Sequence, residues 1–78
     1  SITPNPATTQ ITVQYKAENI SSGYLVITHP SGTPNDNFIL NLNQNTKVIN
    51  TSNYAAGNYN LILICDGQVR DTKVLNIQ

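Results

Sequence analysis

Charged residues, cysteine and tryptophan are scarce or absent in this sequence, and each shortage excludes a class of protein. Only four basic and four acidic side chains occur among 78 residues, and the formal net charge is zero. Nucleic-acid binding and attachment to anionic lipid both need clustered Lys and Arg, so the composition argues against both. No run approaches the roughly 20 apolar residues of a membrane span, so no transmembrane segment is expected. The single cysteine, Cys65, has no partner for an internal disulfide, and we expect a small buried apolar side chain at a strand end.

Motifs that carry catalysis or ligand binding are also missing, and we predict that the protein is not an enzyme and uses no cofactor. The sequence has no paired carboxylates, metal-ligand cluster, glycine-rich phosphate loop or nucleophile elbow. His29 lies beside Pro30 at a predicted strand end, with no evident catalytic partner. Asp36 lies in an Asn-Asp-Asn run, but a calcium site needs several oxygen ligands at defined spacing, so we interpret this run as an Asx-rich turn. The sequence therefore predicts no catalytic, cofactor-binding or metal-binding residue.

The chain does contain short stretches of alternating or β-branched apolar residues, which indicate strands. No segment keeps the 3.6-residue period of an amphipathic helix, and turn residues recur every 8 to 12 positions. The predicted strands are 10–15, 24–29, 37–42, 46–50, 58–65 and 69–77. This pattern predicts a single all-β domain over residues 1–78, a β-sandwich, with a small barrel or an incomplete sandwich as alternatives. The tryptophan and the cysteine pair of an antibody domain are absent, so this is not a true immunoglobulin domain.

Asp66-Gly67 is the sharpest local signal. A two-residue Asp-Gly link between strands is typical of a type I′ turn, whose central residues both need positive φ. We therefore expect strands 58–65 and 68–77 to form an antiparallel hairpin.

The first strand of this hairpin is apolar on both faces. In the run from Leu61 to Cys65, Ile62 and Ile64 share the face opposite Leu61 and Leu63. A two-residue turn would pair Ile64 with Val69 and Ile62 with Asp71. The second apolar face is then either covered by another strand or loop, or it is a docking surface.

Three motifs follow one another in a fixed order along the chain. Pro4-Asn5-Pro6-Ala7 precedes the first alternating strand, and Gly57-Asn58-Tyr59 follows Ala55-Ala56. After the Asp66-Gly67 turn, Lys73 begins an apolar run. In this order and at this spacing the motifs resemble the C-terminal sorting domain of the type IX secretion system, also called the Por secretion tail. The resemblance covers essentially the whole chain.

The resemblance implies an immunoglobulin-like antiparallel β-sandwich of about seven strands, excised here from a larger cargo protein. It implies a non-catalytic signal that directs exported cargo through the periplasm and across the outer membrane of a Gram-negative bacterium, to the surface or the medium. The implied partners are the outer-membrane translocon and sortase-like components of the type IX system, and an N-terminal cargo domain in the parent chain. Candidate residues for translocon recognition are Gly57, Tyr59, Ile62, Ile64, Lys73, Val74 and Leu75, and the family motif at the domain start is Pro4, Asn5 and Pro6.

For several of these residues we also expect a structural role. Pro4 and Pro6 would stiffen a segment that separates cargo from domain. Gly57 would adopt a backbone conformation closed to other residues, and Tyr59 would bury its ring and bond its hydroxyl to the backbone. Lys73 either protects a sheet edge or belongs to the recognised signal.

A second function from another class is a ligand-binding or adhesive β-sandwich, for example a carbohydrate-binding module of a multidomain surface protein. Exposed aromatic rings would favour it, because sugars stack on ring faces. The chain has only four Tyr and one Phe, and most of them fall on core-facing strand positions.

Overall fold

The computed structural model describes residues 2–4, 9–16, 18–32 and 35–78, and within these ranges the chain forms seven strands and no helix. The all-β prediction is therefore confirmed. The strands are β1 (Ile2–Thr3), β2 (Gln10–Gln14), β3 (Gly23–Thr28), β4 (Asn35–Ile39), β5 (Thr46–Asn50), β6 (Gly57–Cys65) and β7 (Gln68–Ile77).

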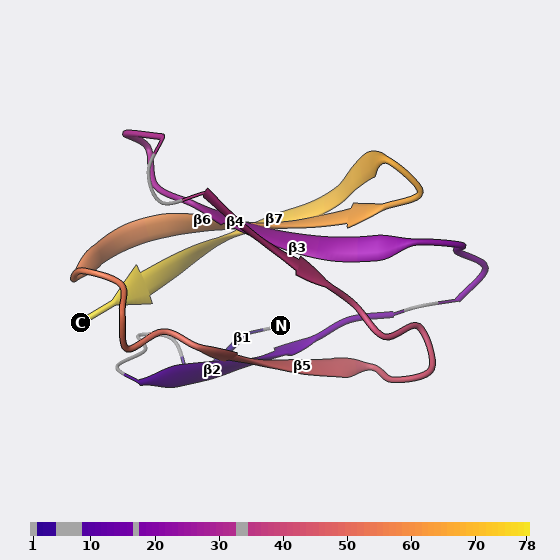
Figure 1. Ribbon diagram of the computed structural model, residues 1–78, viewed down its shortest axis with the longest axis horizontal. Coiled ribbons are helices and arrows are strands. Elements are labelled where there is room, and N and C mark those ends of the chain that lie inside the picture. Colours follow the sequence, from indigo (N-terminus) through magenta and orange to yellow (C-terminus); the bar gives the residue numbers. More distant parts are fainter. Residues whose placement is uncertain (1, 5–8, 17, 33–34) are drawn as a thin grey trace.

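The strands build two antiparallel sheets that stack as a sandwich, with one layer above the other in Figure 1. The smaller sheet has the order β1-β2-β5, and the larger has the order β4-β3-β6-β7. The most apolar strand of the sequence, β6, is thus an inner strand of the larger sheet. The molecule measures 35 × 22 × 16 Å, and the antiparallel β-sandwich prediction is confirmed.

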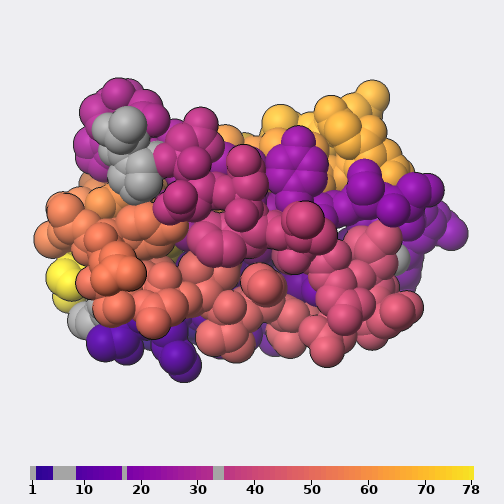
Figure 2. All heavy atoms as spheres, in the orientation of Figure 1, coloured from indigo at the N-terminus to yellow at the C-terminus, as the bar shows by residue number. Residues whose placement is uncertain are grey.

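The two long sides of the sandwich are closed differently. On the side turned to the viewer in Figure 2, the side chains of β4, of β5 and of the connection between them cover the space between the sheets. On the opposite side the edge strands are β1 and β7. Because β1 has only two residues, this second side is covered by less backbone than the first.

The core lies between the sheets and follows from strand alternation. Side chains alternate inward and outward along the strands, and both sheets contribute to one apolar cluster, together with Tyr15 and Leu40 just beyond the ends of β2 and β4. The buried members are Ile11, Val13, Tyr15, Leu25, Ile27, Leu40, Ile49, Tyr59, Leu61, Leu75 and Ile77. Cys65 is also buried, at the end of β6, as expected of a small apolar side chain.

The predicted strand 37–42 is displaced in the structure, where β4 spans Asn35–Ile39. The Leu40 amide still donates to the Gly23 carbonyl, but Asn41 then turns the chain, because its side chain accepts the Asn43 amide at 2.8 Å. Asp36 consequently lies inside a strand, and its interpretation as part of an Asx-rich turn is wrong. The short strand β1 is a further element that the sequence pattern did not predict.

The hairpin of β6 and β7 closes through the predicted turn. Asp66 and Gly67 have φ angles of 52° and 80°, the positive values that a type I′ turn needs. The Asp66 carboxylate also accepts the backbone amides of Ser21 and Ser22 at 2.8 and 3.0 Å, which fastens the turn to the connection before β3.

The register of this hairpin differs from the expected one after its first pairs. Ile64 pairs with Val69 as predicted, but a register shift between Leu63 and Ile64 makes Ile62 pair with Thr72. The predicted pairing of Ile62 with Asp71 is therefore wrong. A bulge inserts one extra residue into β7 and moves every later partner by one position.

Candidate recognition surface

The outward face of β6 is open. Tyr59, Leu61 and Cys65 point into the sandwich and are buried, whereas Ile62 and Ile64 alternate to the other side and are half-buried. No other layer of the described chain lies over them, as the upper sheet in Figure 1 shows. Of the two alternatives for the second apolar face of β6, coverage by another element is not seen among the described residues, and Ile62 and Ile64 there remain partly accessible to solvent.

Apolar side chains on this face form rows that cross neighbouring strands. The registers place Ile39 opposite Tyr24, Tyr24 opposite Ile64, and Ile64 opposite Val69, so one row crosses all four strands. Ile39 and Val69 remain 84% and 64% exposed. A second row, two residues along, pairs Val26 of β3 with Ile62 of β6. We name these six residues the apolar stripe: Tyr24, Val26, Ile39, Ile62, Ile64 and Val69.

Sequence reasoning found only part of the stripe. It assigned Ile62, Ile64 and Val69 to one face but missed Tyr24, Val26 and Ile39. The alternation in the predicted strand 37–42 placed Phe38 inward, so Ile39 had to point outward. That signal could have identified Ile39 as an exposed apolar residue, although not as a neighbour of Tyr24.

Val74 belongs to the same outward face but lies beyond the stripe. It pairs with Asn60, is 60% exposed, and is a diagonal neighbour of Ile62. Of the seven recognition candidates, the structure therefore brings three onto one surface: Ile62, Ile64 and Val74.

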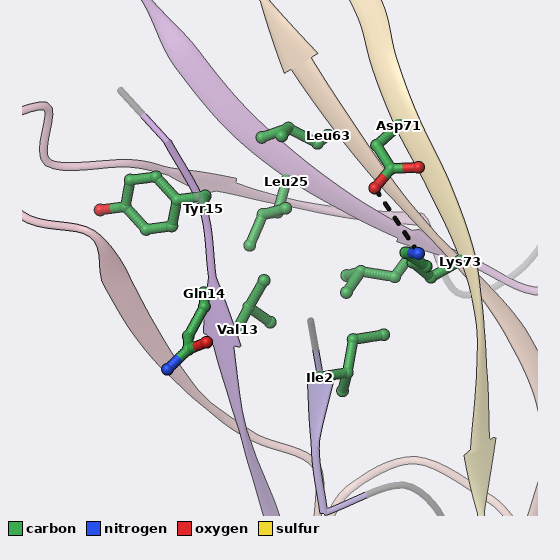
Figure 3. Close-up of a pocket in the computed structure, with 9 residues that line it drawn as sticks. Ile2, Val13, Gln14, Tyr15, Leu25, Leu63, Asp71 and Lys73 are labelled. Atoms are coloured by element: carbon green, nitrogen blue, oxygen red, sulfur yellow. Dashed lines mark ion pairs between the residues drawn. The ribbon is translucent and has the colours of Figure 1, made fainter. Parts of the chain in front are cut away.

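Lys73 points to the other side of β7, toward the second long side of the sandwich. Figure 3 shows it with Asp71 above Ile2 and Val13, where the Lys73 Nζ lies 4.0 Å from the Asp71 Oδ2. We call this side the lateral seam. The side chains around it line a small, partly open pocket of about 30 Å³, room for about one water molecule.

Charge at this position has a structural explanation. Lys73 and Asp71 occupy the inward phase of an edge strand, the same side of β7 as Leu75 and Ile77. Charges that point inward on an edge strand discourage pairing with another chain, because such pairing would bury them. The geometry supports edge protection by Lys73.

Three other candidates support the fold from inside. Leu75 is fully buried, and Tyr59 is 3% exposed with its hydroxyl donating to the Ala55 carbonyl at 2.6 Å. Gly57 has a φ of 151°, which L side chains rarely adopt, and nothing lies within 4 Å of a Cβ built there. The structural expectations for Tyr59 and Gly57 are confirmed.

The motif at the domain start lies partly outside the described residues. Asn5 and Pro6 are among the residues that the structure does not describe, whereas Pro4 directly follows β1. Ile2 and Thr3 of β1 pair with Val13 and Thr12 of β2. In the sequence the motif lies between β1 and β2, so it precedes the first alternating strand but not the first strand of the smaller sheet.

Three aromatic side chains, His29, Tyr54 and Tyr59, line a hollow at one end of the sandwich. His29 meets the Tyr59 ring edge-on at 5.2 Å, and Tyr54 lies against Tyr59 at 5.5 Å. The Tyr54 hydroxyl donates to the Asp36 Oδ2 at 2.6 Å. Burial, followed by this bond and the negative charge of Asp36, raises the pKa of Tyr54 above its ordinary value. Both tyrosine hydroxyls are thus engaged inside the domain.

Within the described ranges, no group of three or more His, Cys, Asp or Glu side chains could hold a metal ion. None of the described segments forms a helix long and apolar enough to cross a bilayer.

These features define a class of protein: a small antiparallel β-sandwich with an open, apolar sheet face. A family model described as "Secretion system C-terminal sorting domain" matches residues 1–78. The chain therefore belongs to the family of type IX secretion C-terminal sorting domains, which is a family of sorting signals and not of catalysts. No curated protein matches the sequence significantly. No solved structure matches it significantly either.

Proposed function

We propose that this domain is the export signal by which the outer-membrane translocon of a type IX system recognises a cargo protein. The observation that carries the proposal is the family match over residues 1–78, which identifies a secretion sorting signal. The route runs through the periplasm of a Gram-negative bacterium, and the cargo reaches the cell surface or the medium. The cargo domain lies in the same parent chain, and sortase-like components act after the translocon.

The positions of the candidate residues suggest a division of roles. Ile62, Ile64 and Val74 lie on the open face and are accessible to a translocon component. Tyr59 and Leu75 are buried, so they act through the fold that holds this face in place. Gly57 serves the same end by allowing β6 to begin.

A reporter fusion tests this function. Residues 1–78 are fused behind a signal peptide and a folded reporter and expressed in a bacterium that has a type IX system. We expect the reporter at the surface or in the medium, and we expect a matched fusion without residues 1–78 to remain in the periplasm. Deleting a translocon component should return the first fusion to the periplasm. Periplasmic retention of the intact, folded fusion in the wild-type strain would refute the proposal.

A further inference from the structure

The two outer faces of the sandwich differ in chemistry although both belong to one small domain. The larger sheet exposes the apolar stripe, with rows of Asn and Thr beside it. The smaller sheet exposes polar residues such as Gln10, Thr46 and Asn50, with Val48 as an exposed valine among them. Scattered apolar residues are normal on a protein surface, but that does not explain why they are concentrated on one face here.

Charge is excluded from the face that carries the stripe. All eight charged residues are among those the structure describes, and none points outward from a strand of the larger sheet. Asp36 bonds to Tyr54, and Arg70, Asp71 and Lys73 line the seam side. Lys47 shares the inward phase of Ile49, and the others lie in turns or connections: Lys16, Glu18 and Asp66.

We infer that the apolar stripe is the surface that binds the export partner, and that this partner presents an uncharged, apolar protein surface to it. The inference rests on the proposed function and names the chemistry of its partner. A charged partner surface would lose hydration against this face and gain no opposite charge, so only an apolar one is complementary.

The same chemistry favours a protein over a lipid surface. Attachment to an anionic bilayer surface depends on Lys and Arg, and none of the described residues on that face is basic; Tyr24 is the one aromatic residue of the stripe.

The size of the stripe favours a transient partner over a second copy of the domain. At about 4.8 Å between strands and about 7 Å between rows, it spans on the order of 15 × 7 Å. Six residues make up the stripe, whereas each side of a stable complex contributes about 20–30. A small apolar contact is suited to a partner that captures the domain and then releases it.

Three matched substitutions test the inference in the exported reporter fusion. Val69→Lys and Ile39→Lys each put a charge on the stripe, and Val48→Lys puts the same charge on the other sheet, at a valine 57% exposed. All three sites are exposed in the free domain, so we expect each melting temperature to stay within about 4 °C of the parent. We expect Val69→Lys and Ile39→Lys to lower export at least about tenfold, and Val48→Lys to leave it unchanged.

Photocrosslinking identifies the partner. A benzophenone amino acid is placed at position 69 or, as the control, at position 48 of the secretion-competent fusion. We expect a crosslink to a type IX outer-membrane component from position 69 only.

Equal export of all three lysine variants would overturn the inference, as would a crosslink from position 69 to lipid or to a second copy of the domain. In each of these cases the parent fusion is still exported, and the proposed function stands. If the parent fusion itself is not exported, the proposed function fails instead.

Discussion

Leu61 and Ile62 are adjacent on β6 but face opposite sides of the sheet, and replacing each in turn tests whether only one face is core. Leu61 is 3% exposed and belongs to the apolar cluster between the sheets. Truncating such a side chain to alanine removes its burial and leaves a cavity, at a cost of about 2–5 kcal/mol. Ile62 is half-buried, so Ile62→Thr keeps the β-branched shape and costs about 1 kcal/mol or less.

These free energies convert into melting temperatures. The entropy of unfolding is about 2.1 cal/mol/K per residue, or about 0.16 kcal/mol/K for the 78 residues. Leu61→Ala should therefore lower the melting temperature by about 12–30 °C, and Ile62→Thr by about 6 °C or less. Circular dichroism of the purified domain during heating measures both values. An equal loss in the two variants would refute the reasoning, because it would mean that a further layer covers the outward face of β6.

Three other changes test the remaining structural claims. Gly57→Ala should lower the free energy of unfolding in urea by about 1–3 kcal/mol, through backbone strain alone. Gly23→Ala is the control: its added Cβ would meet its neighbours at 3.5–3.6 Å, so it should be neutral or stabilising, and similar losses in the two variants would contradict the role of the Gly57 φ of 151°. The raised pKa of Tyr54 means that its contribution to stability is complete below about pH 10 and is lost as the pH rises further. Tyr54→Phe should therefore show a shallower loss of stability at alkaline pH than the parent, and parallel curves would exclude this origin. Lys73→Ala removes one exposed ion pair at 4.0 Å and should change the free energy of unfolding by about 0–1 kcal/mol; a larger change would show that Lys73 holds the lateral seam together.

The strands that the sequence predicted are those with enough alternating residues to define a period. Strand β5 was predicted at its observed bounds, and the predicted strand 58–65 starts one residue after β6. Strand β1 escaped prediction because two residues before a proline carry no period at all. The bulge in β7 escaped because no glycine or proline marks the sequence Val69-Arg70-Asp71.

The apolar stripe was predictable only in part, for a similar reason. Alternation within β6 puts Ile62 and Ile64 on one face, and that is local information. The alignment of Ile39, Tyr24 and Ile64 in one row depends on the registers between β4, β3 and β6. Those registers are set by turns and core packing across distant parts of the chain, which a single-sequence pattern does not contain.

The place of β6 in the larger sheet has a consequence for timing. Chains are synthesised from the N-terminus, and β3 and β4 emerge before β6, the strand that joins them to β7. A nascent chain that stops at residue 56 has two strands of this sheet but neither the inner strand beside them nor its hairpin partner. Four of the eleven buried residues of the core cluster, Tyr59, Leu61, Leu75 and Ile77, would be missing as well. Only a chain elongated through both final strands assembles the four-stranded face, so an interrupted translation product lacks it.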